Sequence, residues 1–284
     1  MPKFHIHSSL IVATGLLLSS AQSATALEMT EIGQIQIGDG EGFAEMIRYH
    51  SESESLMVTA SETGTIERIS MSNPAVMSMM PPLDLDGGDV TAVAVHDNLV
   101  AASIKAKAAD APGMVKLFDV AGNLLARFET GALPDNVAFS PDGRYLLTAN
   151  EGEPSDDYMV DPEGSFTLID LAGGAANAKV TQISLDGIEA PAGSRIVKPG
   201  SSFAADAEPE YVAFAPDGKT AYVTLQENNA VAVIDIDTAQ VAKVVGLGVK
   251  NVSRTSHDMS NKDNGINMKR WPVLMMYQPD AVVA

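Results

Sequence analysis

The sequence predicts an all-β protein, and within that class a β-propeller. A short motif recurs along the chain at intervals of about 45 residues. Each copy reads as alternating strands separated by turn residues, and none shows the 3.6-residue patterning of a helical repeat. Units of three or four strands repeated at this spacing are typical of propeller blades.

Two copies of the motif are clear. "PDNVAFSPDGRYLLTANEG", from Pro134, aligns without a gap to "PEYVAFAPDGKTAYVTLQE", from Pro209. Each contains a short strand, a turn built on Pro-Asp-Gly, and a second strand. A third strand follows at 165–171 and at 230–236. The second copy is of the YVTN type, so we expect blades like those of YVTN and WD40 propellers.

Two weaker copies begin near Glu45 and Thr91, and the copy beginning near Asp135 is longer than the others, chiefly after Leu171. A fifth copy begins with "QPDAVVA", from Gln278. Residues 27–284 are therefore expected to hold about four blades and the first strand of a fifth. We interpret this as an incomplete propeller whose C-terminal part is missing; a closed ring of four blades is the alternative.

The first 26 residues predict an exported protein. They contain one Lys3, an apolar run from Leu10 to Leu18, and the small residues Ala24 and Ala26, which together are typical of a signal peptide cut near Ala26. The apolar run is short for a membrane span, and no second run reaches that length. The expected location is secreted, periplasmic or on the cell surface.

The composition excludes some partners. The net charge of −19 argues against nucleic acid and anionic membranes, and favours cations. The chain has no cysteine and five histidines, which disfavours thiolate or histidine-rich metal sites. We find no nucleophile elbow, zinc-protease motif or P-loop. Whether the protein is an enzyme stays open. Both His50 and His96 fall at expected blade turns and are predicted to lie on the surface.

Carboxylates recur at one position of the repeat. The first strand opens with Glu45, Asp135, Glu210 and Asp280 in four copies, and with Thr91 in the other. First strands line the channel of a propeller, so these acids are expected to form most of a ring. A divalent cation would relieve their mutual repulsion, and calcium accepts six to eight oxygen ligands in loose geometry.

The loop "NEGEPSDDYMVDPEGS", Asn150 to Ser165, adds two acid pairs, each spaced i, i+2. Its prolines and glycines restrict the backbone around them. A calcium site is predicted here; a solvated loop and a cationic partner are the alternatives. The expected metal ligands are Glu151, Glu153, Asp161, Glu163, Asp135 and Glu210.

The words Asn-Glu-Gly-Glu-Pro at 150–154 and Asp-Pro-Glu-Gly-Ser at 161–165 resemble those of the choice-of-anchor I family of secreted β-propellers. That family is similar to mesenchyme-specific cell-surface glycoproteins, and some members are labelled alkaline phosphatase-like. The resemblance covers roughly residues 28–284 and implies a fuller propeller in an extracellular location.

From these observations we expect an exported, calcium-binding propeller that acts as a cell-surface or extracellular binding module. The alternative is a calcium-dependent, alkaline phosphatase-like phosphomonoesterase acting on a phosphorylated small molecule by metal-assisted hydrolysis. A purely structural propeller without an ion is the third reading.

Overall fold

A computed structural model describes residues 30–38 and 44–284 of the chain. The chain separates after Ile32 into two units, and every element named below belongs to the second, residues 33–284. The predicted signal peptide, residues 1–26, lies outside the described residues. Among those that are described, no helix has both the length and the apolar character needed to cross a bilayer.

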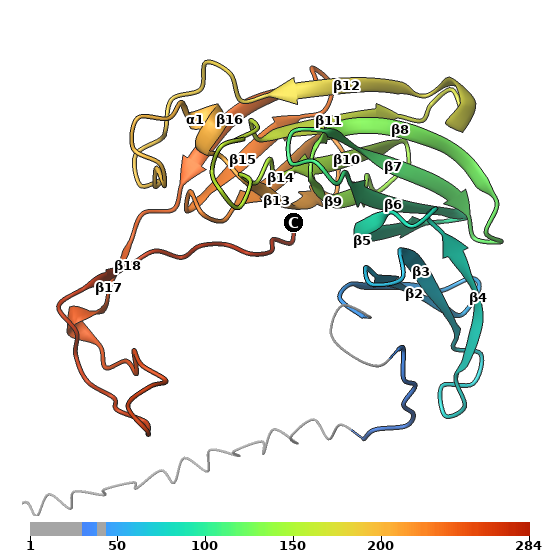
Figure 1. Ribbon diagram of the computed structural model, residues 1–284, viewed down its shortest axis with the longest axis horizontal. Coiled ribbons are helices and arrows are strands. Elements are labelled where there is room, and N and C mark those ends of the chain that lie inside the picture. The colour runs from blue at the N-terminus through green and yellow to red at the C-terminus, as the bar shows by residue number, and fades with distance from the viewer. Residues whose placement is uncertain (1–29, 39–43) are drawn as a thin grey trace, which may run out of the picture. The chain divides into compact units, whose positions relative to one another are not determined.

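Four antiparallel sheets of four strands follow one another along the chain, and within each sheet the strands are ordered as in the sequence (Figure 1). This confirms the predicted blades. Blade 1 contains β1 (Ile47–His50), β2 (Ser55–Ala60), β3 (Thr65–Ser70) and β4 (Ser78–Asp84); blade 2 contains β5 (Asp89–His96), β6 (Leu99–Lys105), β7 (Pro112–Asp119) and β8 (Leu124–Ala132); blade 3 contains β9 (Pro134–Phe139), β10 (Tyr145–Asn150), β11 (Ser165–Asp170) and β12 (Lys179–Ser184); blade 4 contains β13 (Pro209–Phe214), β14 (Thr220–Leu225), β15 (Ala230–Asp235) and β16 (Gln240–Gly246).

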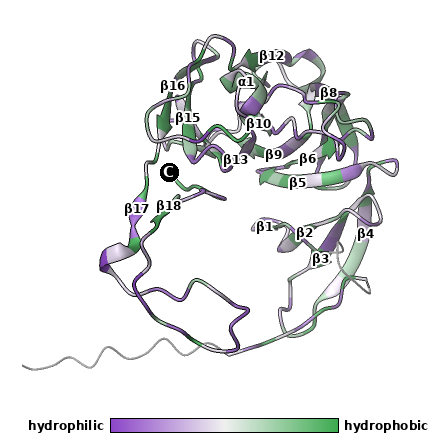
Figure 2. Ribbon diagram, turned by 60° about the vertical axis from the view of Figure 1, so that its left-hand side comes forward, coloured by the Kyte–Doolittle hydropathy of each residue, from purple (hydrophilic) through white to green (hydrophobic). Residues whose placement is uncertain are grey.

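The first strands of successive blades contact one another, and Figure 2 shows β5, β9 and β13 side by side. Buried apolar side chains form three clusters, each shared by two successive blades. Phe166 of β11, for example, is fully buried in the cluster between blades 3 and 4. Burying one such side chain stabilises the fold by about 1.5–3 kcal/mol, so these clusters hold successive blades together.

The Pro-Asp-Gly turns form as the sequence predicts. The amide of Gly143 donates to the Ser140 carbonyl, and the amide of Gly218 donates to the Ala215 carbonyl, both at 2.9 Å. In each turn the aspartate side chain also accepts from the backbone amide two residues later, at 3.1 Å for Asp142 and 3.0 Å for Asp217. These bonds close the hairpin between the first and second strands of blades 3 and 4.

The surface prediction for His50 is wrong. Its side chain is buried, with Nε2 lying 2.5 Å from the Asp97 carbonyl oxygen and Nδ1 lying 2.6 Å from Ser53 Oγ. The repeat pattern places His50 at a turn but does not show that the turn of blade 2 packs against it. The contact therefore joins blade 1 to blade 2.

After blade 4, β17 (Lys250–Asn251) pairs with β18 (Leu274–Met275). Short helical turns interrupt the loops, and one of them is α1 (Phe203–Asp206), which precedes blade 4. The predicted strand at 278–284 pairs with no strand among the described residues. The segment nevertheless contacts blade 4, because Asn229 Oδ1 accepts from the amides of Tyr277 and Gln278, and Thr224 Oγ1 donates to the Asp280 carbonyl.

Candidate functional site at the acidic mouth

In blades 2, 3 and 4 the residues predicted to open the first strands sit at β-bulges. The register between the first and second strands shifts around Thr91 in blade 2, around Asp135 in blade 3 and around Glu210 in blade 4. A bulge bends its strand and redirects the side chain of the extra residue. In blade 4 the bulge is supported by Thr224 Oγ1, which accepts from the Tyr211 amide at 3.0 Å.

A second position of the repeat faces the same mouth of the channel. It lies at the end of the second strand or directly after it, and because that strand is antiparallel to the first, its residue lies beside the bulge. Its occupants in blades 1 to 4 are Ser61, Lys105, Glu151 and Gln226. The mouth is thus built from two residues per blade, and its chemistry depends on which residues occupy them.

Five carboxylates from blades 3 and 4 gather there, and we call them the acidic mouth: Asp135, Glu151, Glu208, Glu210 and Glu227. All five are partly buried. Burial raises the pKa of Asp135 to about 6, that of Glu208 to about 7 and that of Glu151 to about 8, and neighbouring carboxylates add to each shift. At neutral pH, desolvation and mutual repulsion therefore both disfavour the ionised forms of these carboxylates.

Glu210 and Glu227 form the closest part of the mouth. Burial raises the pKa of Glu210, and Glu227, Glu151 and Asp135 raise it further. When the Gln226 amide nitrogen is turned toward Glu210, it donates to both carboxylate oxygens at 2.9 Å. Glu227 Oε2 is buried and has no hydrogen-bond partner in residues 30–38 and 44–284. An unpartnered buried carboxylate oxygen is costly, and this one is a vacant acceptor for a cation or proton.

Glycine explains why the loop approaches the mouth so closely. Gly152, with φ of +65°, lies where a Cβ would come within 3.0 Å of the Glu163 backbone. A Cβ on Gly164 would lie 2.0 Å from the Ala207 carbonyl oxygen. Its amide donates to the Ala204 carbonyl at 3.0 Å. Glycines in the two acid-rich words of the loop therefore allow residues 151–164 to lie against the segment before blade 4.

The six predicted ligands have different fates. Asp135, Glu151 and Glu210 belong to the acidic mouth. Glu153 is exposed, but it lies close enough to raise the pKa of Asp135, Glu151 and Glu208. Asp161 forms an ion pair with Lys198 instead.

Glu163 is exposed and does not contribute to the shifts of the mouth carboxylates. Of the remaining predicted ring, Asp280 acts on Asp135, whereas Glu45 accepts a hydrogen bond from Ser61 Oγ at 2.9 Å. Both Glu208 and Glu227 were missed by the repeat pattern. The signal was available, because Glu227 directly follows the mouth position Gln226 and Glu208 lies two residues before the mouth position Glu210.

Asp206 supports the rim of the mouth. Its buried carboxylate accepts from the amides of Val197 at 2.9 Å and Lys198 at 2.6 Å, and from Asn228 Nδ2 at 2.8 Å. A cavity of about 220 Å³ lies beside it. Its polar lining includes Glu153, Tyr158, Asp161, Lys198, Glu208 and Glu227. The mouth is therefore continuous with a cavity in which one cation, Lys198, faces several acids.

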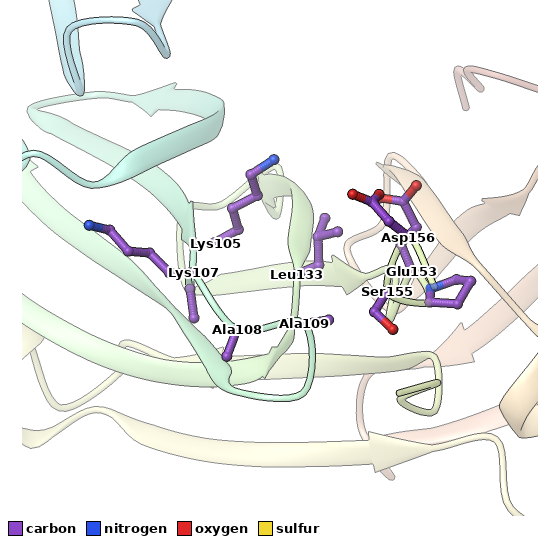
Figure 3. Close-up of a pocket in the computed structure, with 10 residues that line it drawn as sticks. Lys105, Lys107, Ala108, Ala109, Leu133, Glu153, Ser155 and Asp156 are labelled. Carbon is purple, nitrogen blue, oxygen red and sulfur yellow. The ribbon is translucent and has the colours of Figure 1, made fainter. Parts of the chain in front are cut away.

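A second cavity, of about 310 Å³, lies between the loop after β6 and the loop after β10. In Figure 3 the ammonium groups of Lys105 and Lys107 lie on one side of it, and the carboxylates of Glu153 and Asp156 on the other. Lys105 pairs with Asp89 at 3.3 Å and lowers the pKa of Asp135, partly opposing the effect of burial there. The mouth thus carries a cationic side chain, Lys105, in blade 2 and carboxylates in blades 3 and 4.

The donor set of the mouth consists of carboxylate oxygens, which are the ligands that calcium prefers. Within residues 30–38 and 44–284, no three histidine, aspartate or glutamate side chains are already gathered at metal-binding distances. A cation would therefore have to draw the side chains together, and the buried Oε2 of Glu227, which has no partner among the described residues, is one oxygen it could engage.

Solved structures share the fold of this chain. Kuenenia stuttgartiensis hydrazine synthase superimposes with a TM-score of 0.52 at 17% identity, covering 69% of this chain and 53% of that one. The Cps50 (Swd1) β-propeller domain of Myceliophteria thermophila gives a TM-score of 0.52 at 10% identity, with coverages of 75% and 60%. A functionally unknown protein from Desulfotomaculum acetoxidans gives 0.51 at 13%, with coverages of 77% and 61%.

The chain thus spans between 53% and 61% of the length of these structures, and at such identities the likeness establishes the propeller fold alone. Comparison with curated proteins gives no significant match. The family profile described as the choice-of-anchor I domain matches residues 45–284, which include all four blades and the acidic mouth.

Proposed function

This chain belongs to the choice-of-anchor I family, and we propose that it is an exported propeller that binds calcium at its acidic mouth and recognises an extracellular or cell-surface partner there. Membership in this family supports an exported or surface location. The propeller fold and the family together support a binding module.

The observation that carries the calcium proposal is the convergence of Asp135, Glu151, Glu210 and Glu227 from two successive blades. The negative charges of these partly buried carboxylates repel one another, and Lys105 is a nearby cation. A divalent ion would satisfy the orphaned Glu227 oxygen and remove the repulsion. Magnesium demands a tighter octahedral shell than carboxylates from separate loops provide, so calcium fits better.

Thermal unfolding of the full chain tests the proposal. We expect calcium to raise the melting temperature over a chelator control, because an ion that binds only the folded state at 100 times its Kd adds about 2.7 kcal/mol. For a protein of this size that corresponds to roughly 5–10 °C. Magnesium should give a smaller rise.

Two glutamates of the same loop provide the matched variants. Glu151→Gln removes a charge from the mouth and should abolish most of the calcium-dependent rise, while increasing stability in chelator by relieving repulsion. Glu163→Gln removes the same charge from an exposed position and should leave the rise unchanged. No calcium-dependent rise in the wild type, or an equal loss in both variants, would show the proposal to be wrong.

One observation favours the alternative, a calcium-dependent phosphomonoesterase. Lys198 lines the cavity beside Glu208 and Glu227, so a phosphate group could meet both a cationic side chain and a bound ion. Hydrolysis of a chromogenic phosphate monoester that requires calcium and is lost in Glu151→Gln would support this activity. A calcium-dependent melting rise without turnover would support the binding module alone.

A further inference from the structure

In each of the four blades, the residue three positions after the opening residue of the first strand lies at the same level of the channel. The residues there are Arg48 in β1, Ala94 in β5, Ala138 in β9 and Ala213 in β13. At about 3.3 Å per residue this level lies roughly 10 Å from the mouth. All four line a cavity of about 330 Å³. Arg48 therefore stands alone among alanines.

Among the described residues, Arg48 has no acidic partner. Its Nη1 donates to the carbonyl of its own neighbour Ile47 at 3.0 Å, and its Nη2 donates to the Tyr211 hydroxyl at 3.4 Å, which is long for such a bond. Within the part of the chain that the structure describes, no aspartate or glutamate lines the cavity. A partly buried guanidinium normally finds a carboxylate or phosphate, since its fork of donors matches their paired oxygens.

A second group points to the same kind of ligand. Asn136 also lines the cavity and is only 2% exposed. Its Oδ1 accepts from the Val212 amide at 3.5 Å, but its Nδ2 donates to no atom of the described residues. This amide group can therefore donate to a ligand in the cavity. With the hydroxyl of Tyr211, the cavity thus offers three donors from three blades and walls of Phe139 and Phe214.

We propose that this axial cavity binds a small ligand through an oxyanion, a phosphate or carboxylate group, held by Arg48 with Asn136 and Tyr211. The volume is at the small end of the range for ligand pockets, so a compact ligand fits. The apolar walls weaken competition from water and strengthen the charged hydrogen bonds. This site is separate from the acidic mouth, and it needs no metal ion.

Calorimetric titration of the full chain with inorganic phosphate and, separately, with acetate tests the proposal. A chelator is present throughout, so a failure of the calcium site does not affect the result. We expect saturable binding of at least one anion, and the tighter of the two identifies the group. Arg48→Gln should weaken binding at least tenfold. Tyr211→Phe, which keeps the ring and removes the hydroxyl, should weaken it less.

Arg254→Gln is the matched control, because Arg254 is exposed outside the cavity and its loss changes the net charge equally. Binding by this variant should equal that of the wild type. Circular dichroism establishes that each variant is folded. If the wild type binds neither anion, or if Arg48→Gln and Arg254→Gln bind alike, the axial cavity is not an oxyanion site. If Arg48→Gln fails to fold, unchanged binding by Tyr211→Phe decides against the site and weakened binding supports it.

Discussion

At the mouth of the channel, blade 3 carries Asp135 and Glu151 where blade 2 carries Thr91 and Lys105. The backbone is alike in both, with a bulge at the first position and the second position beside it. In blade 2 the Thr91 hydroxyl bonds Ser103 Oγ at 2.9 Å and the Pro134 carbonyl at 2.5 Å, so its polar group is satisfied within the protein. In blade 3 the equivalent acid, Asp135, is partly buried, and its carboxylate accepts no hydrogen bond from the described residues.

The difference shows that a repeated backbone can be given a local function by substitution at two positions per blade. The insertions add to it, because residues 151–164 and 186–208 contribute to the cavity beside the part of the mouth formed by blades 3 and 4. They bury the acids, and they supply Asp206 and Glu208. The repulsion in blades 3 and 4 is retained where a structural role alone would favour neutral residues.

The largest effect on the free energy of unfolding is expected from replacing Asp206, which supports the rim of the mouth. Asp206→Ala leaves the amides of Val197 and Lys198 and the Asn228 side chain without their acceptor. Leaving buried donors unsatisfied should lower the free energy of unfolding by roughly 2–4 kcal/mol, measured by denaturant titration. Asp186→Ala, at an exposed position of the same insertion, should change it by less than about 0.5 kcal/mol. Equal losses of stability in the two variants would show that Asp206 does not support the rim.

The pH dependence of the protein in chelator should sharpen the comparison next. The pKa values of Asp135, Glu208 and Glu151 rise on folding to about 6, 7 and 8. Because folding favours their protonated forms, the stability they contribute is full below the unfolded values near 4 and is lost as the pH rises through 6 to 8. The melting temperature should therefore fall between about pH 5 and about pH 8.5.

Glu151→Gln should make this fall shallower, and calcium should reverse more of it at higher pH, because the ion needs the ionised carboxylates. Glu163→Gln should follow the wild-type profile. A profile that rises with pH in chelator would contradict the raised pKa values on which the acidic mouth rests.

The smallest expected effect lies at the boundary with blade 2. Lys105→Gln removes the cation that lowers the pKa of Asp135, so calcium affinity should rise, by up to about fivefold because the lysine is partly exposed. Lys107→Gln removes the same charge from the neighbouring lysine of the cavity in Figure 3 and should have less effect, since Lys107 does not act on Asp135. Isothermal titration with calcium measures both. A larger gain for Lys107→Gln would place the bound cation nearer to Lys107 than to Lys105 and Asp135, outside the acidic mouth.

The sequence predicted much of the site because the repeat has a fixed geometry. Alternating apolar residues and Pro-Asp-Gly turns placed Asp135 and Glu210 at equivalent points, and both lie in the acidic mouth. The i, i+2 argument for Glu151 and Glu153 required the second strand to continue, but β10 ends at Asn150. Beyond that residue alternation no longer determines direction, which is why Asp161 turns to Lys198 and Glu163 to solvent.

By itself, the sequence determined the propeller, its blade boundaries and the position of the mouth, because strand alternation and turn residues act over a few neighbouring residues. Only the tertiary structure decided that Glu208 and Glu227 join the mouth, that His50 is buried against blade 2, and that Arg48 faces three alanines across the channel. Those outcomes depend on contacts between residues far apart in the chain. Local patterns carry no record of such contacts.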